Sequence, residues 1–342
     1  APLGKWLIGL GMQVFGPSNP IGWRIVPALV GIASVWLVYK IALEIFGSKR
    51  WALLPAFLLA IDGQAIVISR TAILDGLVMF FVVLGFYFLV RAINSEQPSM
   101  LLIVMVLVLG AGAGVKWSSA LFLAVFMLYY AWTKKRWTSL LYLPLAAVPY
   151  LLSWIGWFVT QGWGYQVGNP VGSFISYHLQ MYHFHSTLYS YHPYQSSAST
   201  WLAMLRPTSF FFENNQGTVS AINPIGNPVI WLAGIAALGM LFAWFAQNRD
   251  KLGLLVFTGY IAGYLPWLVF SGRTSFQFYS VVFEPWILLA ITLMAYRYRS
   301  LKLVVWASLA TFAIFLFFLP IYLGFQIPLW FWQLHMWLPT WI

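Results

Sequence analysis

Long apolar segments recur along almost the whole chain, separated by short polar or basic connections. Each approaches the length of about 20 residues that an α-helix needs to cross the hydrocarbon core of a bilayer. Their apolar residues surround the helix axis, whereas a helix of a soluble protein keeps a polar face. We therefore predict ten membrane-spanning segments, at residues 24–46, 51–68, 72–93, 99–115, 117–133, 138–159, 228–246, 252–270, 278–296 and 302–322.

Composition agrees with this pattern. Of the 342 residues, 61% are hydrophobic and only 7% are charged, whereas soluble domains are about 25% charged. The sequence thus predicts an all-α integral membrane protein, a polytopic bundle of about ten transmembrane helices. The absence of cysteine excludes disulfides and thiolate metal sites. No phosphate-binding glycine-rich loop and no nucleophile elbow occurs, so we do not expect a nucleotide as the direct substrate.

The net charge of +11 indicates orientation in a membrane and not nucleic-acid binding, because the basic residues lie in short loops between apolar segments. When the predicted spans alternate across the bilayer, twelve of the 18 Lys and Arg residues fall on one side. An excess of Lys and Arg marks the cytoplasmic side. We expect a multi-pass plasma-membrane protein whose outer side carries the other six, Lys5, Arg24, Arg70, Lys116, Arg206 and Arg273.

The predicted spans divide the chain into three parts. Residues 1–160 form an N-terminal transmembrane part, and residues 228–342 form a C-terminal part of four helices with an aromatic tail. Between them, residues 161–227 form an external loop, and a non-spanning segment of this length usually carries function. Within it, 173–188 has the pattern of an aromatic-rich amphipathic helix lying at the membrane surface.

Four of the outward basic residues, Arg24, Arg70, Lys116 and Arg273, lie at the ends of predicted spans. Ionisable residues at such depth are costly and are candidates for function. Arg guanidinium groups bind phosphate oxygens in pairs of hydrogen bonds, so the four residues can bind the phosphate of a lipid at the outer leaflet. The alternative is that each side chain extends to the lipid headgroups without a further role.

Acidic residues are scarcer, and the outward ones are Asp62, Asp75, Glu213 and Glu284. Asp75 is the candidate within the chain for a catalytic carboxylate that acts as a base. We favour for it a helix-terminal carboxylate, or a salt bridge that orients Arg70. Asp62 and Glu284 can each pair with an arginine or line a cavity. The five histidines include no pair at i, i+4 spacing, so we predict no metal site and no cofactor.

Short motifs along nearly the whole chain make the sequence resemble the bacterial, actinobacterial-type protein O-mannosyltransferases, a family of GT-C membrane glycosyltransferases. No single motif is diagnostic, but their order and spacing together are specific. They are Pro2-Leu3-Gly4-Lys5-Trp6, Gly22-Trp23-Arg24, Asp62-Gly63, Ser69-Arg70-Thr71-Ala72-Ile73-Leu74-Asp75, Lys116-Trp117-Ser118, His192-Pro193-Tyr194-Gln195-Ser196, Arg206-Pro207, Leu265-Pro266-Trp267, Arg273-Thr274, Phe278-Tyr279 and Met336-Trp337-Leu338-Pro339.

The resemblance implies transfer of mannose, with inversion, from a polyprenyl-phosphate carrier to Ser or Thr of exported proteins at the outer face. It implies eleven spans in the complete protein. It also implies an Asp-Glu pair, in a loop before the Pro2-Leu3-Gly4-Lys5 stretch, as the catalytic base. This chain contains no Asp-Glu dipeptide, so we expect it to be a fragment. In the long loop, we expect the acceptor or sugar site to include His192, Tyr194, Trp201 and Arg206.

Three alternatives remain open from the sequence. The first is a GT-C glycosyltransferase with a lipid or glycan acceptor, which composition does not distinguish. The second is a transporter or flippase of a lipid-linked sugar, which often shows inverted repeats and broken helices. Here the outward charges gather at one end of the spans and no half is repeated. The third is a structural membrane protein without catalytic activity.

Overall fold

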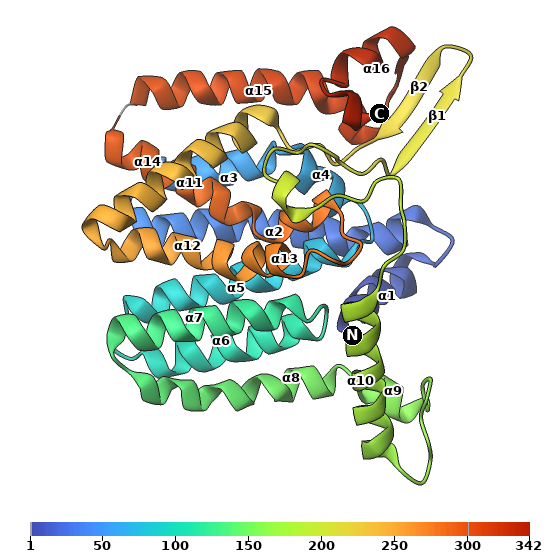
Figure 1. Cartoon of the computed structure of the whole chain (residues 1–342), viewed down its shortest axis with the longest axis vertical. Helices are drawn as coiled ribbons and strands as arrows, with labels where there is room; N and C mark the ends of the chain where they lie inside the picture. Colours follow the sequence, from blue (N-terminus) through green and yellow to red (C-terminus); the bar gives the residue numbers. More distant parts are fainter. Residues whose placement is uncertain (1, 300) are drawn as a thin grey trace.

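The structure, a computed structural model, describes residues 2–299 and 301–342. Most of its long helices run side by side, and α10 crosses one end of them at a steep angle (Figure 1). The helices are α1 (Leu3–Phe15), α2 (Pro20–Phe46), α3 (Lys49–Ala60), α4 (Gly63–Ser69), α5 (Leu74–Ile93), α6 (Pro98–Ala113), α7 (Ser118–Lys134), α8 (Ala147–Leu152), α9 (Ile155–Val159), α10 (Pro170–Thr187), α11 (Pro228–Asn248), α12 (Lys251–Gly263), α13 (Leu265–Val269), α14 (Glu284–Tyr298), α15 (Leu301–Leu323) and α16 (Leu329–His335).

Every one of the ten predicted spans falls on helical structure. Four helices, α2, α5, α11 and α15, are long and apolar enough to cross a membrane alone. The pair α3 and α4 would be a fifth span, bent by 65° between its two helices. The chain is therefore a mostly helical, polytopic membrane protein, and the number of ten spans stays a prediction.

Four predicted spans are interrupted, and the one at 278–296 begins as a 3₁₀ helix, Gln277–Val282, before α14 starts at Glu284. The 65° bend between α3 and α4 falls within the segment predicted at 51–68. The segment at 138–159 begins as a 3₁₀ helix, Trp137–Ala146, and breaks again between α8 and α9. The segment at 252–270 divides at Tyr264, where Pro266 begins the short helix α13. Proline lacks the N–H that continues a helix, and Pro266 therefore accounts for the division at Tyr264.

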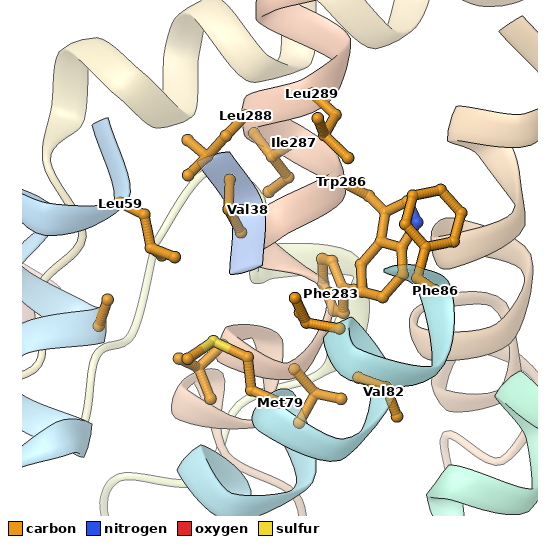
Figure 2. Close-up of a cluster of buried hydrophobic side chains, with 14 of the residues drawn as sticks. Val38, Leu59, Met79, Val82, Phe86, Phe283, Trp286, Ile287, Leu288 and Leu289 are labelled. Carbon is orange, nitrogen blue, oxygen red and sulfur yellow. The ribbon is translucent and has the colours of Figure 1, made fainter. Parts of the chain in front are cut away.

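The core lies where α2, α3, α5 and α14 meet (Figure 2). Trp286 of α14 is fully buried and packs against Phe86 of α5, with ring centroids 5.1 Å apart. Most residues of α14 are buried, which makes it the central helix. By contrast, α15 lies at the rim of the bundle, and only 17% of its most apolar 18-residue stretch is buried.

The predicted surface helix at 173–188 is confirmed as a helix, since α10 spans Pro170–Thr187. It begins where the side chain of Asn169 accepts a hydrogen bond from the N–H of Gly172 at 3.0 Å, as N-cap residues do. The stripe Val171, Ile175 and Leu179, at intervals of four residues, is exposed.

The sequence analysis missed a small sheet at the same end of the molecule as α10 (Figure 1). Strands β1 (Phe211–Asn215) and β2 (Thr218–Ile222) form an antiparallel hairpin, and β3 (Gln326–Pro328) pairs antiparallel with β2. The turn at Gln216-Gly217 has positive φ angles at both residues, which glycine adopts readily. The sheet joins the long loop to the C-terminal segment.

Gly63→Ala is expected to destabilise the protein. A Cβ at Gly63 would overlap the ring of Tyr322 and the carbonyl oxygen of Ile225. Relieving such overpacking costs about 1–3 kcal/mol, so the melting temperature in detergent should fall.

Gly239→Ala is the matched control, because this residue lies within α11 with nothing within 4 Å of an added Cβ. Alanine is the better helix former by about 1 kcal/mol, so this variant should melt at or above the wild-type temperature. Equal melting temperatures for the two variants would contradict the packing described here.

Candidate active site

Two arginines lie close together at the end of the bundle that α10 crosses. Arg70 caps the C-terminus of α4, and its Nη1 donates a hydrogen bond to the Tyr322 carbonyl at 2.8 Å. Burial and the positive charge of Arg24 lower the pKa of Arg70. Arg24 lies on the ring of Trp23, with Cζ 4.3 Å from the ring centroid. Among the described residues no carboxylate forms a salt bridge with either arginine, so the pair is suited to an external anion.

Lys116 is neutralised within the protein. Its Nζ lies 2.8 Å from Oδ1 of Asp75, whose side chain lies in the first turn of α5 and is almost wholly buried. The same Nζ lies 4.0 Å from the ring centroid of Tyr279, a cation–π distance. The predicted salt bridge between Asp75 and Arg70 is wrong, because the turn after α6 brings Lys116 to the carboxylate instead.

Arg273 lies on the neighbouring aromatic ring, with Cζ 5.3 Å from the centroid of Trp267. The rings of Trp267 and Tyr279 are 4.9 Å apart, so Arg273 and Lys116 share one aromatic platform. The Nε of Arg273 is buried, and it has no hydrogen-bond partner within residues 2–299 and 301–342. This donor can receive a ligand oxygen.

The end of α10 is fixed beside Arg273. Thr274 Oγ1 donates to the Ser190 carbonyl at 2.6 Å, and Thr274 N donates to the Leu188 carbonyl at 3.3 Å. Burial and the charges of Arg273 and Lys116 lower the pKa of His185, on the last turn of α10. His185 is therefore neutral at pH 7 and lies near both cations, which the sequence did not predict.

The four predicted phosphate-binding residues thus form two pairs. Arg24 lies near Arg70, and Lys116 lies near Arg273, on turns and helix ends that gather at the same end of the bundle (Figure 1). Their joint contact with a single phosphate stays a prediction.

The start of α1 lies beside Asp75 and Lys116. The N–H of Leu3 donates to the Gly114 carbonyl at 2.9 Å. A Cβ on Gly4 would stand 2.6 Å from the side chain of Leu74 and 2.9 Å from that of Val115. Only glycine allows this approach, which explains the glycine of the Pro2-Leu3-Gly4-Lys5 motif.

Arg206 holds the long loop to the C-terminal segment. Its guanidinium donates to the carbonyls of Pro193, at 2.9 Å, and Ile342, at 3.0 Å. It also lies on the ring of Tyr194, with Cζ 5.0 Å from the centroid. Most N–H donors of the Arg206 guanidinium are therefore bonded to backbone carbonyls of the protein. They give Arg206 a structural role, in addition to the predicted role in an acceptor site.

The other acceptor-site candidates differ in access. Trp201 is 0% exposed and packs against Trp267 with centroids 5.5 Å apart, so it supports the aromatic platform from inside. His192 is exposed and contacts Phe276 edge to face at 5.0 Å. Tyr194 is half-buried under Arg206. Of the three, His192 is the best placed to meet an acceptor.

A chain of hydrogen bonds holds the middle of α10 to the bundle. The Nδ1 of His178 faces the Phe174 carbonyl at 2.8 Å and must donate to it, so Nε2 accepts from Tyr150 Oη at 2.7 Å. Tyr150 Oη accepts in turn from Trp117 Nε1 at 2.8 Å. Burial lowers the pKa of His178, consistent with this neutral form. No group of three His, Asp or Glu residues that can hold a metal ion is found in the described chain.

Asp62 and Glu284 do not pair with an arginine. Both are 0% exposed and lie in a hydrogen-bonded network inside the bundle. Glu284 is the first residue of α14.

Buried charges, a cationic end and a bundle of apolar helices define an integral membrane protein suited to an anionic lipid substrate. Comparison with known proteins is more specific. Residues 1–164 match the family model of dolichyl-phosphate-mannose-protein mannosyltransferases, and residues 170–341 match that of the C-terminal four-transmembrane region of protein O-mannosyltransferases. The chain belongs to the protein O-mannosyltransferase family, and it is a membrane mannosyltransferase.

Individual relatives agree. The polyprenol-phosphate-mannose–protein mannosyltransferase of Mycolicibacterium smegmatis is 28% identical over 99% of this chain and 81% of its own length. That of Mycobacterium tuberculosis is 27% identical over 99% and 80%. The S. cerevisiae Pmt1-Pmt2 complex bound to the sugar donor has a TM-score of 0.84 at 14% identity, covering 100% of this chain and 86% of that chain. At this identity the likeness shows the fold, which is of the GT-C type.

Asp75→Asn is expected to lower the melting temperature in detergent, because it leaves the Lys116 ammonium without its partner. Because the Lys116 side chain is 29% exposed, water compensates part of the lost interaction, and we expect a cost of about 1–3 kcal/mol. The double variant Asp75→Asn/Lys116→Met removes both charges and should recover part of this loss.

Arg91→Ala is the control, since it breaks a 3.8 Å contact with Glu44 between largely exposed side chains. It should cost less than about 1 kcal/mol. If the double variant has a lower melting temperature than Asp75→Asn alone, Asp75 and Lys116 do not act as a pair.

Proposed function

We propose that this chain transfers mannose from a polyprenol-phosphate carrier to Ser or Thr hydroxyls of exported proteins, with inversion at the sugar carbon. One observation carries the proposal: Arg24 and Arg70 lie together without a carboxylate partner among the described residues. The phosphate of a lipid carrier is the anion that a membrane mannosyltransferase must hold. The names of the mycobacterial relatives give a polyprenol-phosphate-mannose donor.

The chemistry follows from charge. The acceptor oxygen attacks the anomeric carbon from the face opposite the phosphate, the bond between carbon and phosphate oxygen breaks, and a carboxylate takes the hydroxyl proton. Fixed guanidinium groups at Arg24 and Arg70 stabilise the negative charge that develops on the leaving phosphate. Arg273, with its unpartnered Nε, is the further donor on the same side.

The proton acceptor has two candidates. Asp75 lies near the platform, but its Oδ1 is 2.8 Å from Lys116 Nζ. That ion pair already occupies one of the two carboxylate oxygens with the Lys116 ammonium. The family resemblance favours an Asp-Glu pair preceding Pro2 for this step, and Asp75 and Lys116 then organise the neighbouring start of α1.

We place the reaction at the extracytoplasmic side of the plasma membrane. The connection from α11 to α12 and the C-terminal end of α14 lie at the end of the bundle opposite α10 (Figure 1). The twelve basic residues assigned to the cytoplasm by charge include those of these two segments. With this orientation all ten helical segments cross the membrane, and residues 161–227 lie outside between the transmembrane parts 1–160 and 228–342.

In the same orientation α10 lies along the outer membrane surface. Its stripe of exposed apolar residues, Val171, Ile175 and Leu179, faces away from the bundle and is suited to the lipid boundary. The long loop that follows it carries His192, which the acceptor protein can reach.

The test is transfer of radiolabelled mannose from polyprenol-phosphate-mannose to a Ser/Thr peptide, in membranes that contain the expressed protein. Arg70→Ala should lower kcat/KM for the donor about 100-fold or more, because removal of one charge-stabilising donor has that effect. Arg91→Ala, an exposed arginine at the opposite end of α5 from Asp75, should leave the rate unchanged.

The protein is expressed from its complete reading frame, so that it carries the Asp-Glu pair which the family resemblance implies. Absence of mannose transfer to peptide in these wild-type membranes would contradict the protein acceptor, and incorporation into lipid or glycan would identify the alternative. Equal rates for Arg70→Ala and the wild type would contradict the phosphate role of Arg70 while leaving the reaction in place.

A further inference from the structure

Two carboxyl groups lie deep in the bundle and take no part in the chemistry described above. Asp62 precedes α4, and Glu284 begins α14; both side chains are 0% exposed. Burial of a carboxylate away from water is costly unless hydrogen bonds compensate it. Their hydrogen bonds differ in kind, and this difference assigns them different tasks.

Asp62 accepts three hydrogen bonds, all from N–H groups. Oδ1 accepts from the backbone N–H of Gln64 at 2.8 Å. Oδ2 accepts from the backbone N–H of Asn227 at 2.9 Å and from Nε1 of Trp231 at 3.0 Å. A group that only accepts, on both oxygens, is an ionised carboxylate. These bonds tie the start of α4 to the first turn of α11.

Glu284 is bound through Gln64. The Oε1 of Gln64 accepts from Gln277 Nε2 at 2.6 Å, so its Nε2 is the donor to Glu284 Oε2 at 3.2 Å. The Glu284 carboxyl group also lies within hydrogen-bond reach of Asp62, and as a neutral acid it can donate its proton to a hydrogen bond with that carboxylate. The contact with Gln64 requires one acceptor atom of Glu284, and a neutral acid or an amide supplies it equally well.

The network holds α4 at its start, and α4 presents Arg70 at its end. The helix has only seven residues, Gly63–Ser69, with Asp62 as N-cap and Arg70 as C-cap. Tyr322 contacts both ends, because its ring covers Gly63 and its carbonyl accepts from Arg70 Nη1. A shift at Asp62 therefore moves the whole short helix and the guanidinium that it carries.

We propose that Asp62 is a positioning residue, which as a buried carboxylate anchors α4 on α11 and so sets Arg70 at the donor phosphate. Glu284 supports the same helix through Gln64 without needing a charge. The inference rests on the proposed role of Arg70, and it assigns the two buried acids unequal importance.

The experiment compares Asp62→Asn with Glu284→Gln, two variants that each change one buried carboxyl group to an amide. In Asp62→Asn an NH₂ group faces N–H donors, and at least one hydrogen bond to a charged acceptor is lost. We expect kcat/KM for polyprenol-phosphate-mannose to fall about tenfold or more, with the peptide KM unchanged. Glu284→Gln keeps the acceptor for Gln64 and should stay within about twofold of the wild type.

A double-mutant cycle separates positioning from general stability. If Asp62 acts through Arg70, Asp62→Asn should have little further effect on donor kcat/KM in the Arg70→Ala background. A further fall as large as in the wild-type background would overturn the proposal, as would equal effects of Asp62→Asn and Glu284→Gln. Two other results would contradict the proposed function and not the role of Asp62. They are absence of mannose transfer by the wild type and full activity of Arg70→Ala.

Trp231→Phe is the second variant, for the case in which Asp62→Asn does not fold. It removes one of the three donors to Asp62 and keeps an aromatic ring in the core. We expect a smaller fall in donor kcat/KM that again disappears in the Arg70→Ala background. The amount of folded protein and its melting temperature in detergent are measured for each variant. An unchanged donor kcat/KM in folded Trp231→Phe would overturn the proposal.

Discussion

The carboxylate of Asp62 connects segments that are far apart in the chain, and the cationic end of the bundle depends on this connection. Its partner Asn227 lies 165 residues away and its partner Trp231 lies 169 residues away. In a bilayer, an unsatisfied polar group costs several kcal/mol, so all three hydrogen bonds must form together. The bend between α3 and α4 follows, since Asp62 ends one helix direction and caps the next.

Charge is treated differently at the two cationic pairs. Lys116 is matched by Asp75 inside the protein, whereas Arg24 and Arg70 have no such partner among the described residues. A neutralised lysine can hold helices α5 and α7 and the start of α1 in place without attracting an anion. An unneutralised arginine pair stores electrostatic strain that a bound phosphate relieves. Under the proposed function, the structural task therefore belongs to Lys116 and the ligand-binding task to Arg24 and Arg70, although the sequence analysis placed all of them in one group of four.

The sequence predicted the helices because each apolar segment carries its own signal, and it found α10 from its aromatic pattern. It missed the sheet, since β3 comes from the C-terminal segment and pairs with β2 over 100 residues earlier. It also chose the wrong partner for Asp75, because Arg70 is near in sequence while Lys116 is 41 residues away. The hydrogen-bonded network around Asp62 could not be predicted either, because its members are also far apart in the sequence. Periodicity reports local structure, and hydrogen bonds between distant helices leave no periodic pattern.

The aromatic platform of Trp267 and Tyr279 links the cationic end of the bundle to the long loop, residues 161–227. Trp201 of the loop packs on Trp267, whose ring also meets Arg273 and Tyr279. Ser275, two residues beyond Arg273, donates to the Ser196 carbonyl of the loop at 2.8 Å. Residues 196–201 of the loop are therefore in contact with the immediate neighbours of Arg273, whereas Arg70 is held by α4 and by the Tyr322 carbonyl. The two cations thus differ in what fixes them, since the position of Arg273 depends on the long loop and that of Arg70 depends on the transmembrane helices.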